Sequence, residues 1–433
     1  MVRFLHTADW QIGMTRHFLQ GEAQARFAAA RIDAIRRLGV VAQQEECEFV
    51  IVCGDVFETN QLSRQTVGRA LEALATIPVP VYLLPGNHDP LDPVTIYRTP
   101  QFVRDCPSQV QVLTDSAPVT VRDGVQLIPA PWFGKHPDHD LVGAALDAAL
   151  GGMPAAAAAD DVSGGPVRIV VGHGAVDVLD PDRTSQASIV LAPLERELAA
   201  GRLHYVALGD RHSRTSVGET GAVWYSGAID VTSHREESPG DVLVVDVAPG
   251  RAPVVVPHHV GTWVFRTLQW ELTASSDVAA LAHQLAATPD KDRTVIRLAL
   301  RGVLGVADHA ELTDLLEEQA EVFAALYLWE RHTTLRVVAD DAELQDFGLG
   351  GFLGAAAEEM RAIARAPELD TVTLLGGEEL DEDDLDAADL ELDGDDALAE
   401  LLDWEFMPDG EPDAKSSVDA LQLLYRLSRE VAR

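Results

Sequence analysis

Five apolar, β-rich runs in the first half of this chain each end directly in small or polar residues. These ends are Asp9-Trp10-Gln11, Gly54-Asp55, Gly86-Asn87-His88-Asp89, Gly172-His173 and Gly209-Asp210-Arg211-His212. Segments with helical periodicity separate most of the runs, and strands that alternate with helices indicate an α/β core. Ligands of open α/β sheets bind outside the carboxyl ends of the strands, so we expect the five ends to meet at one edge.

The side chains at these ends are oxygen and nitrogen donors, and none is a thiolate. Carboxylate, amide and imidazole groups suit Mn²⁺, Fe²⁺, Zn²⁺ or Mg²⁺ far better than a soft metal. The set is large enough for two ions, which can clamp both oxygens of an in-line phosphoryl displacement. The candidate metal ligands are Asp9, Gln11, Asp55, Asn87, His173, Asp210 and His212.

The order of these motifs resembles that of the calcineurin-like metallophosphoesterase superfamily, whose pattern is D-x-H, G-D, G-N-H-D or G-N-H-E, G-H and G-H-x-H. The stretches GDVFE, PGNHDP and VVGHGA match this pattern closely. Within the superfamily, the opening HTADWQIG resembles the SbcD-type DNA-repair exonuclease subunits. The resemblance covers about residues 1–245, and it extends to the architecture of residues 263–338.

The resemblance implies a role for each matched metal ligand. Asp55 would bridge two divalent ions, for which Mn²⁺ is the first expectation. Asp9 and His212 would hold the first ion. Asn87 and His173 would hold the second.

The catalytic residues implied by the resemblance are His88 and Asp89. His88 would act on the scissile phosphate or protonate the leaving group, and Asp89 would orient His88. Two positions depart from the pattern, because Gln11 and Asp210 stand where the family has histidines. Asp210 remains a hard ligand, whereas the neutral amide of Gln11 is a weaker donor than imidazole.

The fold class predicted is α/β (α+β). The resemblance implies a β-sandwich flanked by helices and a small α/β capping domain, and the clustering of acidic residues predicts an acidic C-terminal tail. Strands near residues 223–247 lack intervening helices, so we expect a mixed sheet or sandwich rather than a purely parallel one. The expected segments are a nuclease domain (1–247), a linker (248–262), a capping or DNA-binding-type domain (263–340), a connecting segment (341–377), an acidic, disordered stretch (378–415) and a C-terminal amphipathic helix (416–433).

Charge and cysteine content narrow the functional classes. The 433 residues carry a formal net charge of −37, and 18 of the acidic side chains lie within residues 378–413. This balance argues against a protein that holds nucleic acid by bulk electrostatics. Three cysteines without metal-knuckle spacing suit a reducing cytoplasm, where we expect the protein to act. The sequence contains neither a P-loop nor a Gly-x-Ser-x-Gly motif.

Three other residues near these motifs have an ordinary structural interpretation. We expect His6 to be a hydrogen-bonded core residue of the first strand. Trp10 and Trp132 flank the predicted site, and they could line a groove or pack in the core.

The predicted reaction is metal-dependent hydrolysis of a phosphodiester in DNA. The resemblance implies a homodimer that works with an SbcC-like coiled-coil ATPase. Because the chain is acidic, we expect it to bind DNA only weakly by itself. Two alternatives stay open: a phosphodiesterase or phosphatase for nucleotides or other small molecules, and a non-catalytic scaffold with a degenerate metal site.

Overall fold

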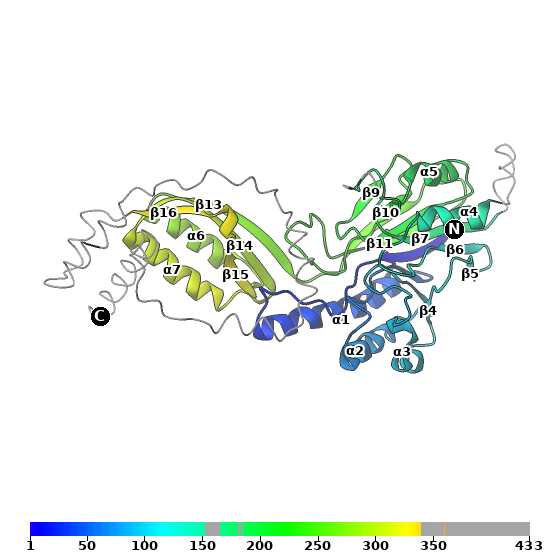
Figure 1. The fold of residues 1–433 in the computed structure, drawn as a ribbon, viewed down its shortest axis with the longest axis horizontal. Helices are drawn as coiled ribbons and strands as arrows, with labels where there is room; N and C mark the ends of the chain where they lie inside the picture. Colours follow the sequence, from blue (N-terminus) through cyan, green and yellow to red (C-terminus); the bar gives the residue numbers. More distant parts are fainter. Residues whose placement is uncertain (152–164, 181, 183–184, 339–358, 360–433) are drawn as a thin grey trace. The chain divides into compact units, whose positions relative to one another are not determined.

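A computed structural model describes residues 1–151, 165–180, 182, 185–338 and 359. The chain forms two compact units (Figure 1). Of the described residues, the first unit takes those within 1–268, 289–297 and 320–327, and the second takes those within 269–288, 298–319 and 328–338 together with residue 359. The segments expected at 341–377, 378–415 and 416–433 lie outside the described residues, apart from residue 359.

The first sheet of the amino-terminal region is mixed, with the strand order β12-β11-β1-β2-β3-β4. Strands β1 to β4 pair in parallel, whereas β11 pairs antiparallel with both β1 and β12. β12 is an edge strand of this sheet and lies within residues 248–262, which the sequence predicted as a linker. The strands are β1 (Val2–Thr7), β2 (Val50–Cys53), β3 (Val81–Leu84), β4 (Val110–Val112), β11 (Asp241–Val247) and β12 (Val254–His259).

The second sheet is also mixed, with the order β5-β6-β7-β8-β10-β9. Strands β6, β7, β8 and β10 pair in parallel, and antiparallel β5 and β9 close the two edges. The strands are β5 (Val119–Arg122), β6 (Val125–Pro129), β7 (Val167–His173), β8 (Tyr205–Gly209), β9 (Thr215–Val217) and β10 (Val223–Tyr225).

The two sheets pack face to face, and helices cover their outer faces. Successive strand residues point to opposite faces, so Phe4 lies in the core between the sheets with Ile169 and Tyr205, whereas its neighbour Leu5 packs with Leu38 of the helical layer. This arrangement confirms the expected mixed sheets. Helices α1 (Gly21–Gln44), α2 (Arg64–Leu74) and α3 (Pro100–Asp105) contribute to the core on the first sheet, and α4 (Leu141–Leu150) and α5 (Leu191–Ala199) to that on the second.

His6 is a hydrogen-bonded core residue, as predicted. Its Nδ1 lies 3.1 Å from the Tyr205 hydroxyl, and its Nε2 lies 3.1 Å from the carbonyl oxygen of Leu208. Burial lowers the pKa of His6 to about 3, so the folded protein holds this imidazole neutral.

We expect His6 to make the protein less stable as the pH falls. Between about pH 6.5, the ordinary pKa of histidine, and about pH 3, His6 is protonated in the unfolded chain but stays neutral in the folded chain. The free energy of unfolding should therefore lose about 1.4 kcal/mol per pH unit from this residue between those values. Urea unfolding of the wild type and His6→Gln at several pH values checks this. Equal pH dependence in the two proteins would contradict it.

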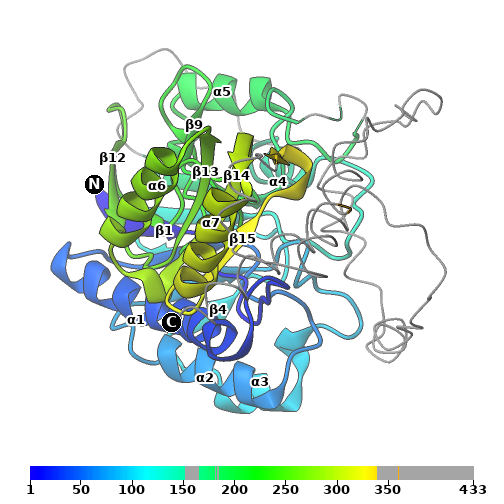
Figure 2. The same ribbon diagram turned by 90° about the vertical axis from the view of Figure 1, so that its left-hand side faces the viewer.

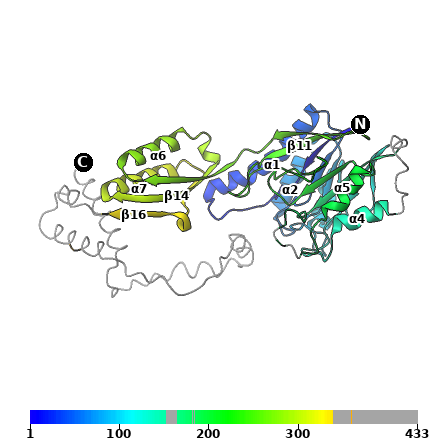
Figure 3. The same ribbon diagram turned by 90° about the horizontal axis from the view of Figure 1, so that it is seen from above.

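Residues 264–338 form a smaller α/β arrangement, the class expected for residues 263–340. Strands β13, β14 and β15 are neighbours in that order, and β16 pairs in parallel with β14. Helices α6 and α7 lie along this sheet (Figure 2 and Figure 3). No helix within the described part of the chain is long and apolar enough to span a membrane. The elements are β13 (Val264–Leu272), α6 (Ser275–Ala287), β14 (Thr294–Gly305), α7 (Val306–Ala320), β15 (Ala325–Leu328) and β16 (Thr334–Val338).

Candidate metal centre

The polar ends of five strands meet, as predicted, at the carboxyl edges of the two packed sheets. Asp9 and Asp55 follow β1 and β2, and the turn that contains Asn87 follows β3. His173 is the last residue of β7, and Asp210 directly follows β8. Both sheets therefore contribute to one site.

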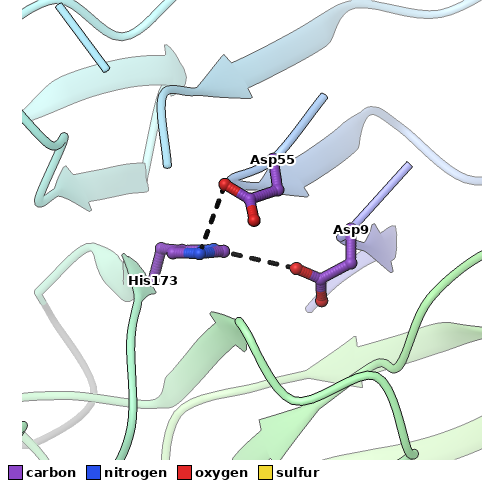
Figure 4. A group of neighbouring side chains, drawn as sticks. All are labelled: Asp9, Asp55 and His173. Atoms are coloured by element: carbon purple, nitrogen blue, oxygen red, sulfur yellow. Dashed lines mark ion pairs between the residues drawn. The ribbon is translucent and has the colours of Figure 1, made fainter. Parts of the chain in front are cut away.

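Asp9, Asp55 and His173 form the buried centre of this site (Figure 4). One donor atom from each lies within 4.8 Å of the others. His173 Nδ1 lies 2.8 Å from the carbonyl oxygen of Cys53. A carbonyl can only accept, so Nδ1 carries a proton, and Nε2 lies 3.4 Å from Asp55 Oδ1. The free lone pair of a neutral His173 would point at the carboxylates, as a metal-binding imidazole requires.

Two further predicted ligands contact this centre. Asn87 Oδ1 lies 2.7 Å from His173 Nε2. Asp210 Oδ1 lies 3.7 Å from the same nitrogen, and the Asp210 backbone N–H donates to Asp9 Oδ1 over 3.0 Å. The centre therefore collects carboxylate, amide and imidazole donors from the ends of strands in both sheets.

Gln11 and His212 form the other side of the site. Gln11 Nε2 lies 3.1 Å from His212 Nε2, while the amide oxygen of Gln11 is buried and has no hydrogen-bond partner among the described residues. A buried amide oxygen without a partner costs about 1–3 kcal/mol. A cation would satisfy it, so the donors present fit a divalent ion.

The backbone is strained at four of the predicted ligands. Positive φ angles occur at Asp9 (51°), Gln11 (42°), Asp55 (52°) and Asp210 (99°). Such angles cost roughly 1–3 kcal/mol per residue and cluster at functional sites. The strand ends thus bend sharply at the residues that would bind metal.

Close packing around the ligands explains why residue 54 is a glycine. A Cβ at Gly54 would lie 2.1 Å from His173 Nδ1, and the φ angle of Gly54 is +89°. Any side chain here would displace the His173 ring or the strand end.

Gly54→Ala is therefore expected to lower the free energy of unfolding by about 3 kcal/mol, because it combines backbone strain with overpacking. Gly124 is a matched control, since its φ is +78° but nothing lies within 4 Å of its Cβ position. Gly124→Ala should lose only about 1 kcal/mol. Urea unfolding of both variants measures the difference, and equal losses would show that crowding at His173 is unimportant.

The electrostatics of the centre favour a bound cation. Burial raises the pKa of Asp9 to about 7, although His212 and His173 lower it. Burial lowers the pKa of His173, but the carboxylates of Asp55, Asp9 and Asp210 outweigh it and raise that pKa to about 9. The buried carboxylates thus draw protons onto neighbouring groups. A divalent ion would supply the same positive charge and displace such protons.

His88 lies beside this centre with a defined ring orientation. Its Nδ1 lies 2.9 Å from the carbonyl oxygen of Glu58 and therefore carries a proton. Its Nε2 lies 3.9 Å from Asp55 Oδ2, and its side chain is 29% exposed. The backbone N–H of His88 also donates to Asp55 Oδ1 over 3.0 Å. The ring is thus anchored at one nitrogen and accessible at the other.

The expectation that Asp89 orients His88 is wrong in this structure. Asp89 Oδ1 accepts the Gly86 N–H at 2.7 Å. Its Oδ2 accepts the Phe57 N–H at 3.0 Å and the Tyr97 hydroxyl at 2.6 Å. Both carboxylate oxygens are thus used to hold the turn that carries Asn87 and His88, and the Glu58 carbonyl orients the His88 ring instead.

The two tryptophans differ in their surroundings. Trp10 is fully buried in the core with its indole N–H donating to Thr7. Trp132 is half-buried, and its indole N–H donates to the carbonyl oxygen of His173 over 2.8 Å. Trp10 is therefore a packing residue, whereas Trp132 supports the end of β7.

Sequence reasoning missed three residues that contact predicted site residues, two at the ligand His212 and one at the catalytic His88. Thr232 and Glu236 both contact His212 Nδ1, at 2.7 Å and 3.1 Å. Glu58 lies against His88, with Oε1 4.0 Å from Nδ1. None of the three belongs to a spaced motif, and only Glu58, three residues after Asp55, offered a signal through its position in GDVFE.

Comparison with known proteins identifies a family and relatives with similar sequences. Residues 2–214 match the sequence profile of the family described as calcineurin-like phosphoesterase. The chain is 27% identical over 344 residues to the SbcD component of nuclease SbcCD from Rhodobacter capsulatus, which covers 69% of this chain and 80% of that protein. It is 27% identical over 134 residues to the protein of the same name from Bacillus subtilis, which covers 30% of this chain and only 28% of that relative.

Solved structures with some likeness to this chain include TT1561 of Thermus thermophilus, with a TM-score of 0.36 and 10% identity over 60% of this chain and 99% of that one. A dimetal phosphatase from Danio rerio gives a TM-score of 0.33 and 12% identity over 59% of this chain and 98% of that one.

Proposed function

Because this chain belongs to the calcineurin-like phosphoesterase family, as its motifs predicted, we propose that it hydrolyses phosphodiester bonds in DNA with two divalent ions. The observation that carries this proposal is the buried cluster of Asp9, Asp55 and His173, whose donor atoms lie within 4.8 Å of one another. Buried carboxylates held this close to an imidazole and flanked by strained backbone are arranged for a cation rather than for stability.

The proposed ligands divide between two ions. Asp55 would bridge the ions, with Asp9 and His212 on the first. Asn87 and His173 would hold the second. Gln11 and Asp210 complete the set, Gln11 through its unpartnered amide oxygen and Asp210 through a carboxylate near His173. When bound, such ions activate water and neutralise the charge that develops on the phosphate.

His88 would protonate the leaving oxygen. Its Nδ1 proton is held by the Glu58 carbonyl, so a proton carried by Nε2 is free for transfer. The partly exposed ring can reach a substrate from outside the buried cluster. A positioned imidazole of this kind contributes about 10²–10⁴-fold to a reaction rate.

The choice of DNA as substrate is supported by the two relatives, which are named as components of a nuclease. The alignment to the Rhodobacter protein spans 344 residues and so extends beyond the family domain at 2–214. We propose, from the motif resemblance, that the chain forms a homodimer and acts with an SbcC-like coiled-coil ATPase. With a net charge of −37, DNA affinity would have to come from the metals, local arginines or this partner.

The experiment that tests this function compares two substrates. Labelled linear DNA and bis(p-nitrophenyl) phosphate are incubated with the full chain in Mn²⁺, Mg²⁺ or chelator, with and without a coiled-coil ATPase partner. Mn²⁺-dependent cutting of both substrates is expected. Hydrolysis of the small diester alone would instead indicate a small-molecule phosphodiesterase, and no hydrolysis of either would indicate a scaffold.

A further inference from the structure

The loop that follows β10 supplies two side chains that contact His212 on the face away from Gln11. His212 Nδ1 lies 2.7 Å from Thr232 Oγ1 and 3.1 Å from Glu236 Oε1. The Thr232 hydroxyl donates to Glu236 Oε1, and the Thr232 backbone N–H donates to Glu236 Oε2 over 2.9 Å. The Glu236 side chain is only 5% exposed, whereas the His212 side chain that it contacts is 25% exposed.

These hydrogen bonds define which nitrogen of His212 is available to the site. The Thr232 hydroxyl proton is already directed at Glu236, and an ionised carboxylate can only accept. Nδ1 of His212 must therefore be the donor in this contact. On the opposite side, the amide N–H group of Gln11 lies 3.1 Å from His212 Nε2 and requires an acceptor there. The two contacts together select the tautomer with a proton on Nδ1 and a lone pair on Nε2, which faces the proposed ligand Gln11.

We propose that Glu236, acting directly and through Thr232, is a positioning residue that holds His212 in the orientation and tautomer needed to bind a divalent ion. This inference rests on the proposed metal-dependent function. A carboxylate on the outer nitrogen of a metal-binding histidine fixes the ring and raises its basicity, and its loss weakens metal affinity by about 10–100-fold.

The contact of Glu236 with His212 is important because residue 11 is a glutamine. The neighbouring donor at this end of the site is the neutral amide of Gln11, which binds a cation more weakly than an imidazole or a carboxylate. The affinity of the first proposed metal position then depends mainly on His212 and Asp9. Any loosening of His212 should therefore appear directly as weaker binding of one ion.

Glu237 provides a matched control one residue along the chain. It is exposed, and its contact with the loop is made by its backbone N–H, which donates to Ser213 Oγ over 3.1 Å. Glu237→Gln removes the same charge as Glu236→Gln from the same loop. It leaves the contacts of His212 intact.

The test is calorimetric titration of Mn²⁺ into the metal-depleted full chain, combined with hydrolysis of bis(p-nitrophenyl) phosphate over a range of Mn²⁺ concentrations. In Glu236→Gln, we expect the Kd of the weaker Mn²⁺ site to rise about 10–100-fold, while that of the stronger site changes by less than about threefold. The Mn²⁺ concentration for half-maximal hydrolysis should rise in parallel, and excess Mn²⁺ should restore kcat. A purely structural role would lower kcat at every Mn²⁺ concentration.

Variants at Thr232 keep the inference testable if Glu236→Gln does not fold. Thr232→Val should weaken the same Mn²⁺ site, and Thr232→Ser, which retains the hydroxyl, should restore it. Wild-type affinity in both Glu236→Gln and Thr232→Val, or equal losses in Glu236→Gln and Glu237→Gln, would overturn this inference alone. Absence of Mn²⁺ binding by the wild type would overturn the proposed function along with it.

Discussion

Asp55→Asn is expected to lower metal-dependent phosphodiester hydrolysis by at least about 10³-fold, because it removes the charge at the point where the proposed ligands converge. Asp55 Oδ1 lies 3.4 Å from His173 Nε2 and also accepts the His88 backbone N–H. Asparagine keeps the shape of the side chain but cannot bridge two cations as a carboxylate does. A loss of several kcal/mol of charge stabilisation corresponds to that change in rate.

The measurement for Asp55→Asn is kcat/KM together with the Mn²⁺ content of the purified protein. Both should fall, whereas Asp123→Asn, which changes an exposed carboxylate, should match the wild type. Wild-type metal content and activity in Asp55→Asn would contradict the assignment of Asp55 as the bridging ligand.

His88→Ala is expected to lower kcat for DNA by about 10²–10⁴-fold while changing Mn²⁺ affinity by less than about threefold. His88 contacts Asp55 through its backbone N–H, which alanine retains. The size of the loss should depend on the leaving group. p-Nitrophenolate departs without a proton, so hydrolysis of bis(p-nitrophenyl) phosphate should suffer much less than cutting of DNA.

The comparison of the two substrates separates proton transfer from damage to the site. His136→Ala serves as a control, since His136 lies exposed in a loop. Equal losses on both substrates would mean that His88 supports the structure of the centre rather than protonating the leaving oxygen.

The position of the site could be predicted from sequence because parallel strands present their carboxyl ends at a common edge. Asp9, Asp55 and His173 are far apart in the chain, yet each follows or ends such a strand. The sequence did not reveal that these strands belong to two packed sheets, with β1 and β2 in one and β7 in the other. The same reasoning predicted His6 as a core residue, because it lies within the first strand.

The role of Asp89 could not be predicted in this way. Adjacent residues at a tight turn point in different directions, and the Asp89 carboxylate is used by Gly86, Phe57 and Tyr97 rather than by His88. Glu236 was missed for a related reason. It contacts His212 from 24 residues away, in a loop without periodicity or motif, so only the folded chain reveals the contact.

The longer elements of the fold followed from periodicity, whereas the short ones did not. α1 has 24 residues and a regular apolar face, but α3 has 6 residues and β4 only 3. So few residues do not complete enough periods to distinguish helix from strand or loop. Their conformation depends on the neighbours against which they pack.

We infer that the buried cluster of Asp9, Asp55 and His173 is a metal-dependent phosphoesterase centre. The most direct test is hydrolysis of bis(p-nitrophenyl) phosphate by the full chain after chelation, before and after Mn²⁺ is added back with its binding stoichiometry measured. We predict no hydrolysis in chelator, and recovery that saturates as two ions bind per chain. Undiminished hydrolysis in chelator, or the absence of Mn²⁺ binding, would contradict the claim.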